Sequence, residues 1–210
     1  MEHLLNERVT MNIDSFFKLS PLASVVKVAS VASLLALTPQ VQAKLVQDRT
    51  ETVDFHDVLD SYELENATLN VIEGRTESVY AFNSNLNLSE ASSVLGTVVA
   101  QAGSNVNMDA SRVVATGDFN SGITLYSSNA LINDSVVSSA DYYGLVASRF
   151  SGSTEGSSVT ANGSVIVGAA GGAVVAAHGV LNLDRSIVQS VDADSFGLRL
   201  QGAQAYARQS

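Results

Sequence analysis

The sequence of 210 residues contains no cysteine and no tryptophan, and it has only two prolines. Without cysteine, neither a disulfide framework nor a thiolate metal site can form. Basic residues are also few, since 11 lysines and arginines stand against 21 acidic residues and the net charge is −10. Phosphate binding needs clustered Lys and Arg, so we expect no nucleic-acid partner. With 46% hydrophobic residues, the chain is nevertheless too apolar to be disordered.

An apolar run near the amino terminus predicts a secretory signal peptide. Residues 28–37, "VASVASLLAL", follow Lys18 and Lys27, and this basic-then-apolar order is typical of such signals. The run is too short to anchor the chain in a bilayer. A short buried helix is the alternative interpretation.

A cleavage site follows the apolar run. Val41 and Ala43 are small residues at the −3 and −1 positions before Lys44. The segment before the run is long for a signal peptide, so Met11 is an alternative start. We assign residues 1–43 to a leader and expect export through the inner membrane, with a mature chain that begins near Lys44.

The rest of the chain repeats one pattern: apolar, any, apolar, polar, any, small, any, apolar. The six copies begin at Tyr62, Leu86, Val106, Ala130, Val159 and Leu181. Their mean spacing of about 24 residues lies in the range of stacked repeat units. Alternation of apolar and polar residues is typical of a strand, so each copy predicts one.

A second predicted strand follows each copy and usually begins at a glycine. The glycines are Gly96, Gly122, Gly144, Gly172 and Gly197, while the first copy has "SVYAF" (78–82) instead. Residues one and three positions after the glycine are expected to point inward. They are Ile123 and Leu125, Leu145 and Ala147, Ala173 and Val175, and Leu198 and Leu200.

Short strands at a regular period, with no helical stretch, predict an all-β parallel β-helix, or solenoid. We expect it to be right-handed, following the general rule for parallel crossovers. Six coils at the inter-strand spacing would form a rod roughly 29 Å long. Residues 62–210 are assigned to the solenoid and residues 44–61 to an amino-terminal lead-in or cap. An antiparallel sandwich also uses many short strands, but it has no reason to repeat one pattern at a near-constant period.

Two polar columns are expected to stack along the solenoid. The fourth repeat position places Asp109, Asn133, Asn162 and Asp184 above one another, after Glu65 and Ser89. The sixth position places Ser111, Ser135, Ser164 and Ser186 above one another, after Ala67 and Ala91. The eighth position is apolar except for Ser93, which Val94 would replace after a bulge.

These columns are interpreted as structural ladders. Asp and Asn end strands because their side chains bond nearby backbone groups. Oxygen atoms in a row could also hold Ca²⁺, but Ca²⁺ needs six to eight oxygens from one place. We therefore expect no metal, no cofactor and no catalytic residue in either column.

Acidic residues outside the columns are the candidates for glycoside chemistry. Asp141, Asp192 and Asp194 fall in the variable gaps between strands, where a site could form. The other charged candidates are Asp118, Asp184, Arg149, Arg185 and Arg199, and the aromatic candidates are Phe119, Tyr126, Tyr142, Tyr143, Phe150 and Phe196. No spacing indicates an acid–base pair, so we expect no enzyme. A polysaccharide-binding or polysaccharide-cleaving β-helix is the alternative.

Two stretches, "GITLYSSNALINDSVVSS" (122–139) and "GLRLQGAQA" (197–205), behind a signal peptide, resemble the passenger domains of pertactin-like autotransporters. The resemblance covers about residues 60–205. It implies a right-handed parallel β-helix that a Gram-negative bacterium displays on its surface or secretes, with a role in adhesion, aggregation or virulence. The implied partners are molecules on host or neighbouring cells. Binding would use the outer face and loops such as 114–121 and 149–158.

The chain departs from that family at its carboxyl end. A complete autotransporter ends in a membrane β-barrel, whereas this chain ends at "AQAYARQS" (203–210), which has the pattern of a further coil. We therefore interpret it as an amino-terminal fragment that lacks its translocator barrel. The full-length protein would reach the outer membrane, the cell surface or the medium, and a truly truncated one would stay in the periplasm.

The leader gives a direct prediction. In an exporting bacterium, the processed chain should begin at Lys44, and Ala43→Phe should block processing because the −1 position must be small. Intact-mass and amino-terminal peptide measurements on the periplasmic fraction check this. Recovery there of a chain that retains residues 28–37 would contradict the assignment.

Overall fold

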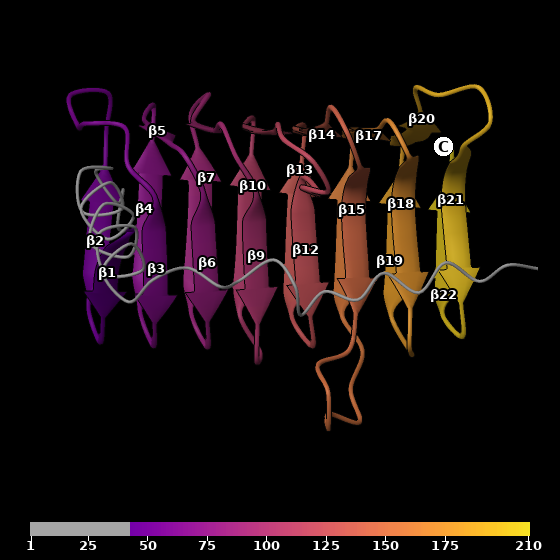
Figure 1. Ribbon diagram of the computed structural model, residues 1–210, viewed down its shortest axis with the longest axis horizontal. Helices are drawn as coiled ribbons and strands as arrows, with labels where there is room; N and C mark the ends of the chain where they lie inside the picture. Colours follow the sequence, from indigo (N-terminus) through magenta and orange to yellow (C-terminus); the bar gives the residue numbers. More distant parts are fainter. Residues whose placement is uncertain (1–42) are drawn as a thin grey trace, which may run out of the picture. The chain divides into compact units, whose positions relative to one another are not determined.

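The computed structural model describes residues 43–210, which form a parallel β-solenoid of eight coils (Figure 1). The leader prediction therefore lies almost wholly outside the described residues. In the part that is described, the chain forms strands, turns and bends, and no helix is long and apolar enough to cross a membrane. At the inter-strand spacing, eight coils make a rod roughly 38 Å long.

Three sheets run along the rod; every coil adds one strand to sheets A and B, and the six middle coils also add one to sheet C. Sheet A contains β1 (Lys44–Gln47), β3 (Tyr62–Glu65), β6 (Val79–Phe82), β9 (Val98–Gln101), β12 (Ile123–Tyr126), β15 (Tyr143–Ser148), β18 (Gly171–Ala176) and β21 (Phe196–Gln201). Sheet B contains β2 (Thr50–Val53), β4 (Thr68–Ile72), β7 (Asn85–Ser89), β10 (Asn105–Asp109), β13 (Asn129–Asn133), β16 (Ser158–Asn162), β19 (Val180–Asp184) and β22 (Gln204–Arg208). Sheet C, absent from the first and last coils, contains β5 (Arg75–Thr76), β8 (Ser93–Val94), β11 (Arg112–Ala115), β14 (Val136–Ser139), β17 (Val165–Gly168) and β20 (Ile187–Ser190).

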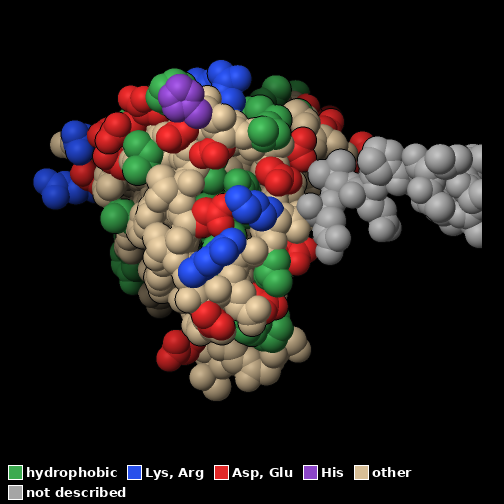
Figure 2. All heavy atoms as spheres, turned by 90° about the vertical axis from the view of Figure 1, so that its left-hand side faces the viewer, with side chains coloured by type: hydrophobic (Ala, Val, Ile, Leu, Met, Phe, Trp, Pro, Cys, Tyr) green, Lys and Arg blue, Asp and Glu red, His purple; other side chains and the backbone are tan. Residues whose placement is uncertain are grey.

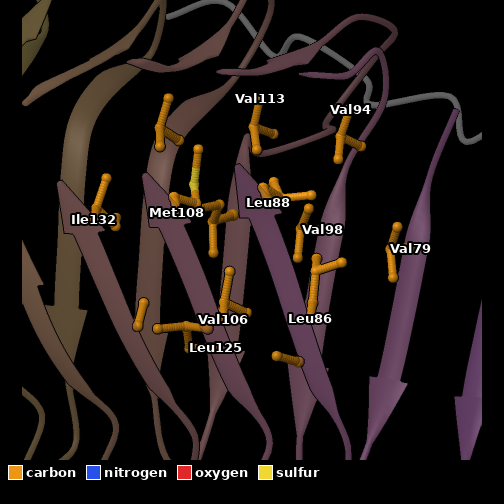
Figure 3. Packing of buried hydrophobic residues seen from close by; sticks show 14 of the residues in the cluster. Val79, Leu86, Leu88, Val94, Val98, Val106, Met108, Val113, Leu125 and Ile132 are labelled. Carbon is orange, nitrogen blue, oxygen red and sulfur yellow. The ribbon is translucent and has the colours of Figure 1, made fainter. Parts of the chain in front are cut away.

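The interior is filled by side chains that alternate along each strand and stack from coil to coil. Leu88, Met108 and Ile132 point inward from β7, β10 and β13, where they pack in one column of sheet B (Figure 3). The facing column of sheet C contains Val94, Val113, Val137 and Ile166. Aliphatic side chains of this size fill a narrow bore without leaving voids.

The expected fold is thus confirmed, but the number of coils is eight rather than six. The pattern that begins at Tyr62 is out of register with the other copies. Tyr62 lies in sheet A and pairs with Val79, whereas Leu86 lies in sheet B and pairs with Leu69. Both segments alternate in the same way, so the pattern alone could not separate one sheet from the other.

The first coil also begins earlier than expected. β1 pairs with β3, and β2 pairs with β4, so the segment 44–61 already contains two strands of the solenoid. Residues 54–61 form the loop that leaves this coil. Residues 44–61 therefore contribute the first strands of sheets A and B to the solenoid.

A bulge shifts the columns in the third coil. Val94, and not Ser93, pairs with Val113 and fills the buried column of sheet C. The extra residue is accommodated where Glu90 and Ala91 both adopt positive φ angles, of 54° and 63°. As a result, Ser92 rather than Ala91 occupies the serine column, and Ser92 Oγ lies 3.2 Å from Ser111 Oγ.

The inward pairs predicted after Gly122, Gly144 and Gly172 are buried, whereas after Gly96 the inward residues are Val98 and Ala100, two and four positions on. Ile123, Leu145 and Ala173 are fully buried one above another. Leu198 and Leu200 continue the same columns, yet they are 37% and 44% exposed. The reason is that β21 is the last strand of sheet A, so no further strand covers these side chains.

Glycines that precede or begin the sheet A strands stack at the corner between sheets C and A. A Cβ atom on Gly122 would lie 2.6 Å from the carbonyl oxygen of Gly144, and one on Gly144 would lie 2.8 Å from that of Gly172. Such distances are too short for a side chain, so the close approach of neighbouring backbones requires glycine here. This packing explains why a glycine recurs near the start of most second strands.

Replacing one of these glycines should destabilise the solenoid. We expect Gly144→Ala to lower the free energy of unfolding by about 1–3 kcal/mol, because the added methyl group meets backbone atoms that cannot move away. Urea denaturation followed by circular dichroism measures the change. Val146→Ala, on the outer surface of the same strand, is the control, and an equal loss in both variants would contradict the steric explanation.

Candidate binding surfaces

The predicted serine column lies at the corner between sheets B and C and forms a continuous chain of hydrogen bonds. The backbone N–H of Ser111 donates to Oγ of Ser135 at 3.0 Å, and the N–H groups of Ser135 and Ser164 donate to the next serines at 3.1 Å. Each hydroxyl in turn donates to the carbonyl two residues earlier, as Ser135 Oγ does to Asn133 at 2.6 Å. These buried hydroxyls are thus occupied in holding the corner.

The residue before each of these serines makes the turn. Ala110, Asp134 and Arg185 have φ angles of 47°, 45° and 49°, and Gly163 has 59°. A single left-handed residue redirects the chain from one sheet to the next. The serine that follows then satisfies backbone groups that the turn would leave unpaired in the interior.

The predicted Asp/Asn column is also in register. Asp109 pairs with Asn133, which pairs with Asn162, which pairs with Asp184. Asn162 Nδ2 donates to Asn133 Oδ1 at 2.8 Å, and Asp184 accepts from Arg185 Nε at 3.3 Å. In the described range 43–210, no three His, Asp or Glu side chains are grouped in a way that would hold a metal ion.

Three further ladders were not predicted from the sequence. Ser84, Ser104, Ser128 and Ser157 line the corner between sheets A and B, where Ser84 N–H donates to Ser104 Oγ at 3.0 Å and Ser128 N–H to Ser157 Oγ at 3.2 Å. Asparagines stack on the outer face of sheet B in two columns, Asn70–Asn87–Asn107 and Asn85–Asn105–Asn129. A serine two residues before the motif in each of these four coils was the signal that could have identified the first ladder.

The acidic residues of the variable gaps are distributed over separate loops. Asp141 Oδ2 accepts the N–H of Gly117 at 3.1 Å and so ties two neighbouring loops together. Asp192 and Asp194 belong to the loop between β20 and β21, where the Asp192 carbonyl accepts the N–H of Ser195. His178 lies at a turn with φ of 67°, and its N–H donates to the carbonyl of Gly202.

Four aromatic residues from three coils meet near the corner of sheets C and A. Ring centroids are 5.8 Å apart for Phe119 and Tyr142, 4.1 Å for Tyr142 and Tyr143, and 5.8 Å for Tyr143 and Phe196. Gly171 makes the last contact possible, because a Cβ there would lie 2.7 Å from the Phe196 ring. Burial, together with the neighbouring Tyr143 hydroxyl, raises the pKa of Tyr142.

A second group of aromatic side chains lies on the outer face of sheet A, which we call the aromatic strip. It consists of the rings of Tyr80, Phe82 and Tyr126 on sheet A, the ring of Phe150 on the loop after β15, and the amide side chain of Gln101. Tyr80, Phe82 and Phe150 are 46%, 51% and 41% exposed, so much of each ring is open to solvent.

Two shallow hollows follow one another along the strip, and Gln101 lines both. The first is lined by Glu63, Glu65, Tyr80, Phe82, Val99 and Gln101. The second is lined by Gln101, Tyr126, Ser148, Arg149, Phe150 and Gly152. Since the two hollows share a side chain, they form a continuous surface over several coils.

The loop 149–157 positions one end of the strip. It projects beyond the edge of the sheets below β15 (Figure 1). Ser127 Oγ accepts the N–H of Phe150 at 2.8 Å and donates to the carbonyl of Glu155 at 2.8 Å. One hydroxyl thus fixes both sides of the loop and holds Phe150 near Tyr126.

Negative charge is concentrated in the first three coils. Residues 44–90 contain ten Asp and Glu side chains but only Lys44, Arg49 and Arg75 as basic residues. Figure 2, which faces this end, shows the carboxylates spread around the exposed surface. Glu51 is paired with Lys44 and with Arg49, and its hydrogen bond raises the pKa of Lys44. The first coils are therefore unfavourable for an anionic partner.

Comparisons of the chain with protein-family models, with curated proteins and with solved structures give no match. Function is therefore inferred from the fold and the side chains of this chain.

The serine column gives a test of its structural role. Ser135→Ala removes the acceptor of the Ser111 N–H, which is left unpaired in the interior, and should cost about 1–3 kcal/mol of the free energy of unfolding. Ser158→Ala, outward on β16, is the matched control and should change it by less than about 0.5 kcal/mol. Equal unfolding curves for the two variants would refute the ladder's contribution.

Proposed function

We propose that this chain is a non-enzymatic, adhesive β-solenoid of the pertactin-like passenger kind, exported and displayed on the bacterial surface. The observation that carries the proposal is the aromatic strip, in which Tyr80, Phe82 and Phe150 expose their rings on one outer face. Exposed aromatic side chains are enriched where proteins bind partners, because they bury a large area with little loss of conformational freedom.

The rigidity of the solenoid supports a role in display. Ladders of serine at two corners and asparagine on sheet B fix neighbouring coils to each other. Polar side chains with this role are unavailable for chemistry, whereas the strip contributes little to the core. A rigid scaffold that presents side chains on a face and on a loop is a common arrangement for binding.

A polysaccharide-binding or polysaccharide-cleaving β-helix is the second candidate. The rings of the strip favour binding, since aromatic side chains stack on sugar rings. Cleavage by the usual glycosidase route needs two carboxyl groups across one bond. Asp141 is tied to the backbone of Gly117, an arrangement that suits a loop anchor better than an acid or a base.

Adhesion gives the direct test. Beads coated with the full chain should bind cultured epithelial cells or bacteria of the source strain, and Tyr80→Ala/Phe82→Ala should reduce the bound fraction at least fivefold by removing two exposed rings. Tyr206→Ala, which removes an exposed ring from sheet B, is the control and should bind like the parent chain. Binding no greater than that of albumin-coated beads would refute the adhesive role.

A separate assay addresses catalysis. The chain is expected to release no unsaturated product from polygalacturonate, with or without added Ca²⁺. Activity that disappears in Asp141→Asn/Asp192→Asn/Asp194→Asn would replace the adhesive proposal with the enzymatic one.

A further inference from the structure

We infer that the aromatic strip binds an uncharged polysaccharide that lies along the solenoid axis, across the strands of sheet A. This inference names the ligand of the surface on which the proposed function rests. It is carried by the register of the strip, by the chemistry of its side chains, by the anchored Phe150 and by the charge around it.

The register places binding groups at regular intervals. Glu65, Phe82, Gln101, Tyr126 and Ser148 are each paired with the next across adjacent strands of sheet A. Successive strands lie about 4.8 Å apart, so the backbone positions of Phe82 and Tyr126 are separated by two steps, roughly 9.6 Å. A linear polysaccharide also repeats at the scale of one sugar ring, so it can place equivalent groups over successive coils.

The alternation of residue types fits the two kinds of surface of a sugar. The C–H face of a pyranose ring is apolar and stacks on an aromatic ring, as Phe82 and Tyr126 offer. Its edge carries hydroxyl groups that both donate and accept hydrogen bonds. The amide of Gln101, between the two rings, has donors and acceptors of its own.

The far end of the strip is organised before a ligand arrives. Ser127 bonds both to the N–H of Phe150 and to the carbonyl of Glu155, so the loop is held at two points. Phe150 and Tyr126 line the same hollow. Because the ring is already in place, binding loses little conformational entropy there.

The charge of the surface selects against acidic glycans. Glu63 and Glu65 line the first hollow beside Tyr80 and Phe82, and the whole chain carries a net charge of −10. A uronate or sulfated polymer would be repelled by Glu63 and Glu65 at the first hollow, and Arg149 is the only basic side chain lining either hollow of the strip. An uncharged polymer keeps the stacking and the hydrogen bonds without that cost.

Titration calorimetry with the full chain tests the inference. The probes are cellohexaose, mannohexaose and chitohexaose as uncharged hexasaccharides, with hexagalacturonate as the acidic comparator. At least one uncharged probe should bind, more tightly than hexagalacturonate. Phe82→Ala and Tyr126→Ala should each weaken that binding about three- to tenfold, whereas Phe119→Ala, an exposed ring outside the strip, should leave it unchanged.

The outcomes separate this inference from the proposed function. Preferred binding of hexagalacturonate, or equal affinity in all three variants, overturns the inference about the ligand. In a third outcome, the chain binds none of the probes, but the coated beads still adhere to cells and this adhesion depends on Tyr80 and Phe82. The strip then has a protein partner, so the glycan inference fails and the adhesive function stands. A chain that binds a hexasaccharide but gives no adhesion retains the inference and loses the proposed function.

Discussion

Parallel, in-register pairing between coils is the constraint on which the rest of this structure depends. Each residue lies beside its own equivalent in the next coil, so every column must be compatible with itself. Leucine and valine satisfy this condition in the interior, glycine at the corner of sheets C and A, and serine and asparagine where backbone or amide groups need partners. Stacked like charges do not satisfy it, which accounts for a charged fraction of only 15%.

The same constraint shapes the outer surface. Side chains that point outward from sheet A are spaced at the distance between coils. A binding surface on this sheet is therefore periodic. On sheet B, the periodic outward side chains are asparagines that hydrogen-bond to one another. Sheet A instead places rings beside the amide of Gln101 along the strip, where Tyr80 and Phe82 remain open to solvent. Two faces of one rod thus have different properties although their backbones are alike.

Periodicity in the sequence was sufficient to predict the solenoid and most of its columns. The pairing of Asp109, Asn133, Asn162 and Asp184 follows from copies that begin at the same repeat position. The copy that begins at Tyr62 was assigned to the wrong sheet, because strands of sheets A and B show the same alternation of apolar and polar residues. The strand pairing, in which Leu86 lies beside Leu69, distinguishes the two sheets. The aromatic cluster and the strip could not be predicted, since Phe119, Tyr143 and Phe196 come from gaps of unequal length, and Phe150 depends on a bond to Ser127.

Coils of this rod differ in length by almost a factor of two. Equivalent positions are 17 residues apart from Ala67 to Ser84 and 29 residues apart from Ser128 to Ser157, yet in both pairs the backbone N–H of the first residue donates to Oγ of the second. The additional residues are in the loops at the corners, such as 149–157, and the strands keep their register. Evolution, or a protein engineer, can therefore graft new peptide segments at these corners and change what the surface recognises while the rod's axis and its hydrogen-bonded columns stay as they are.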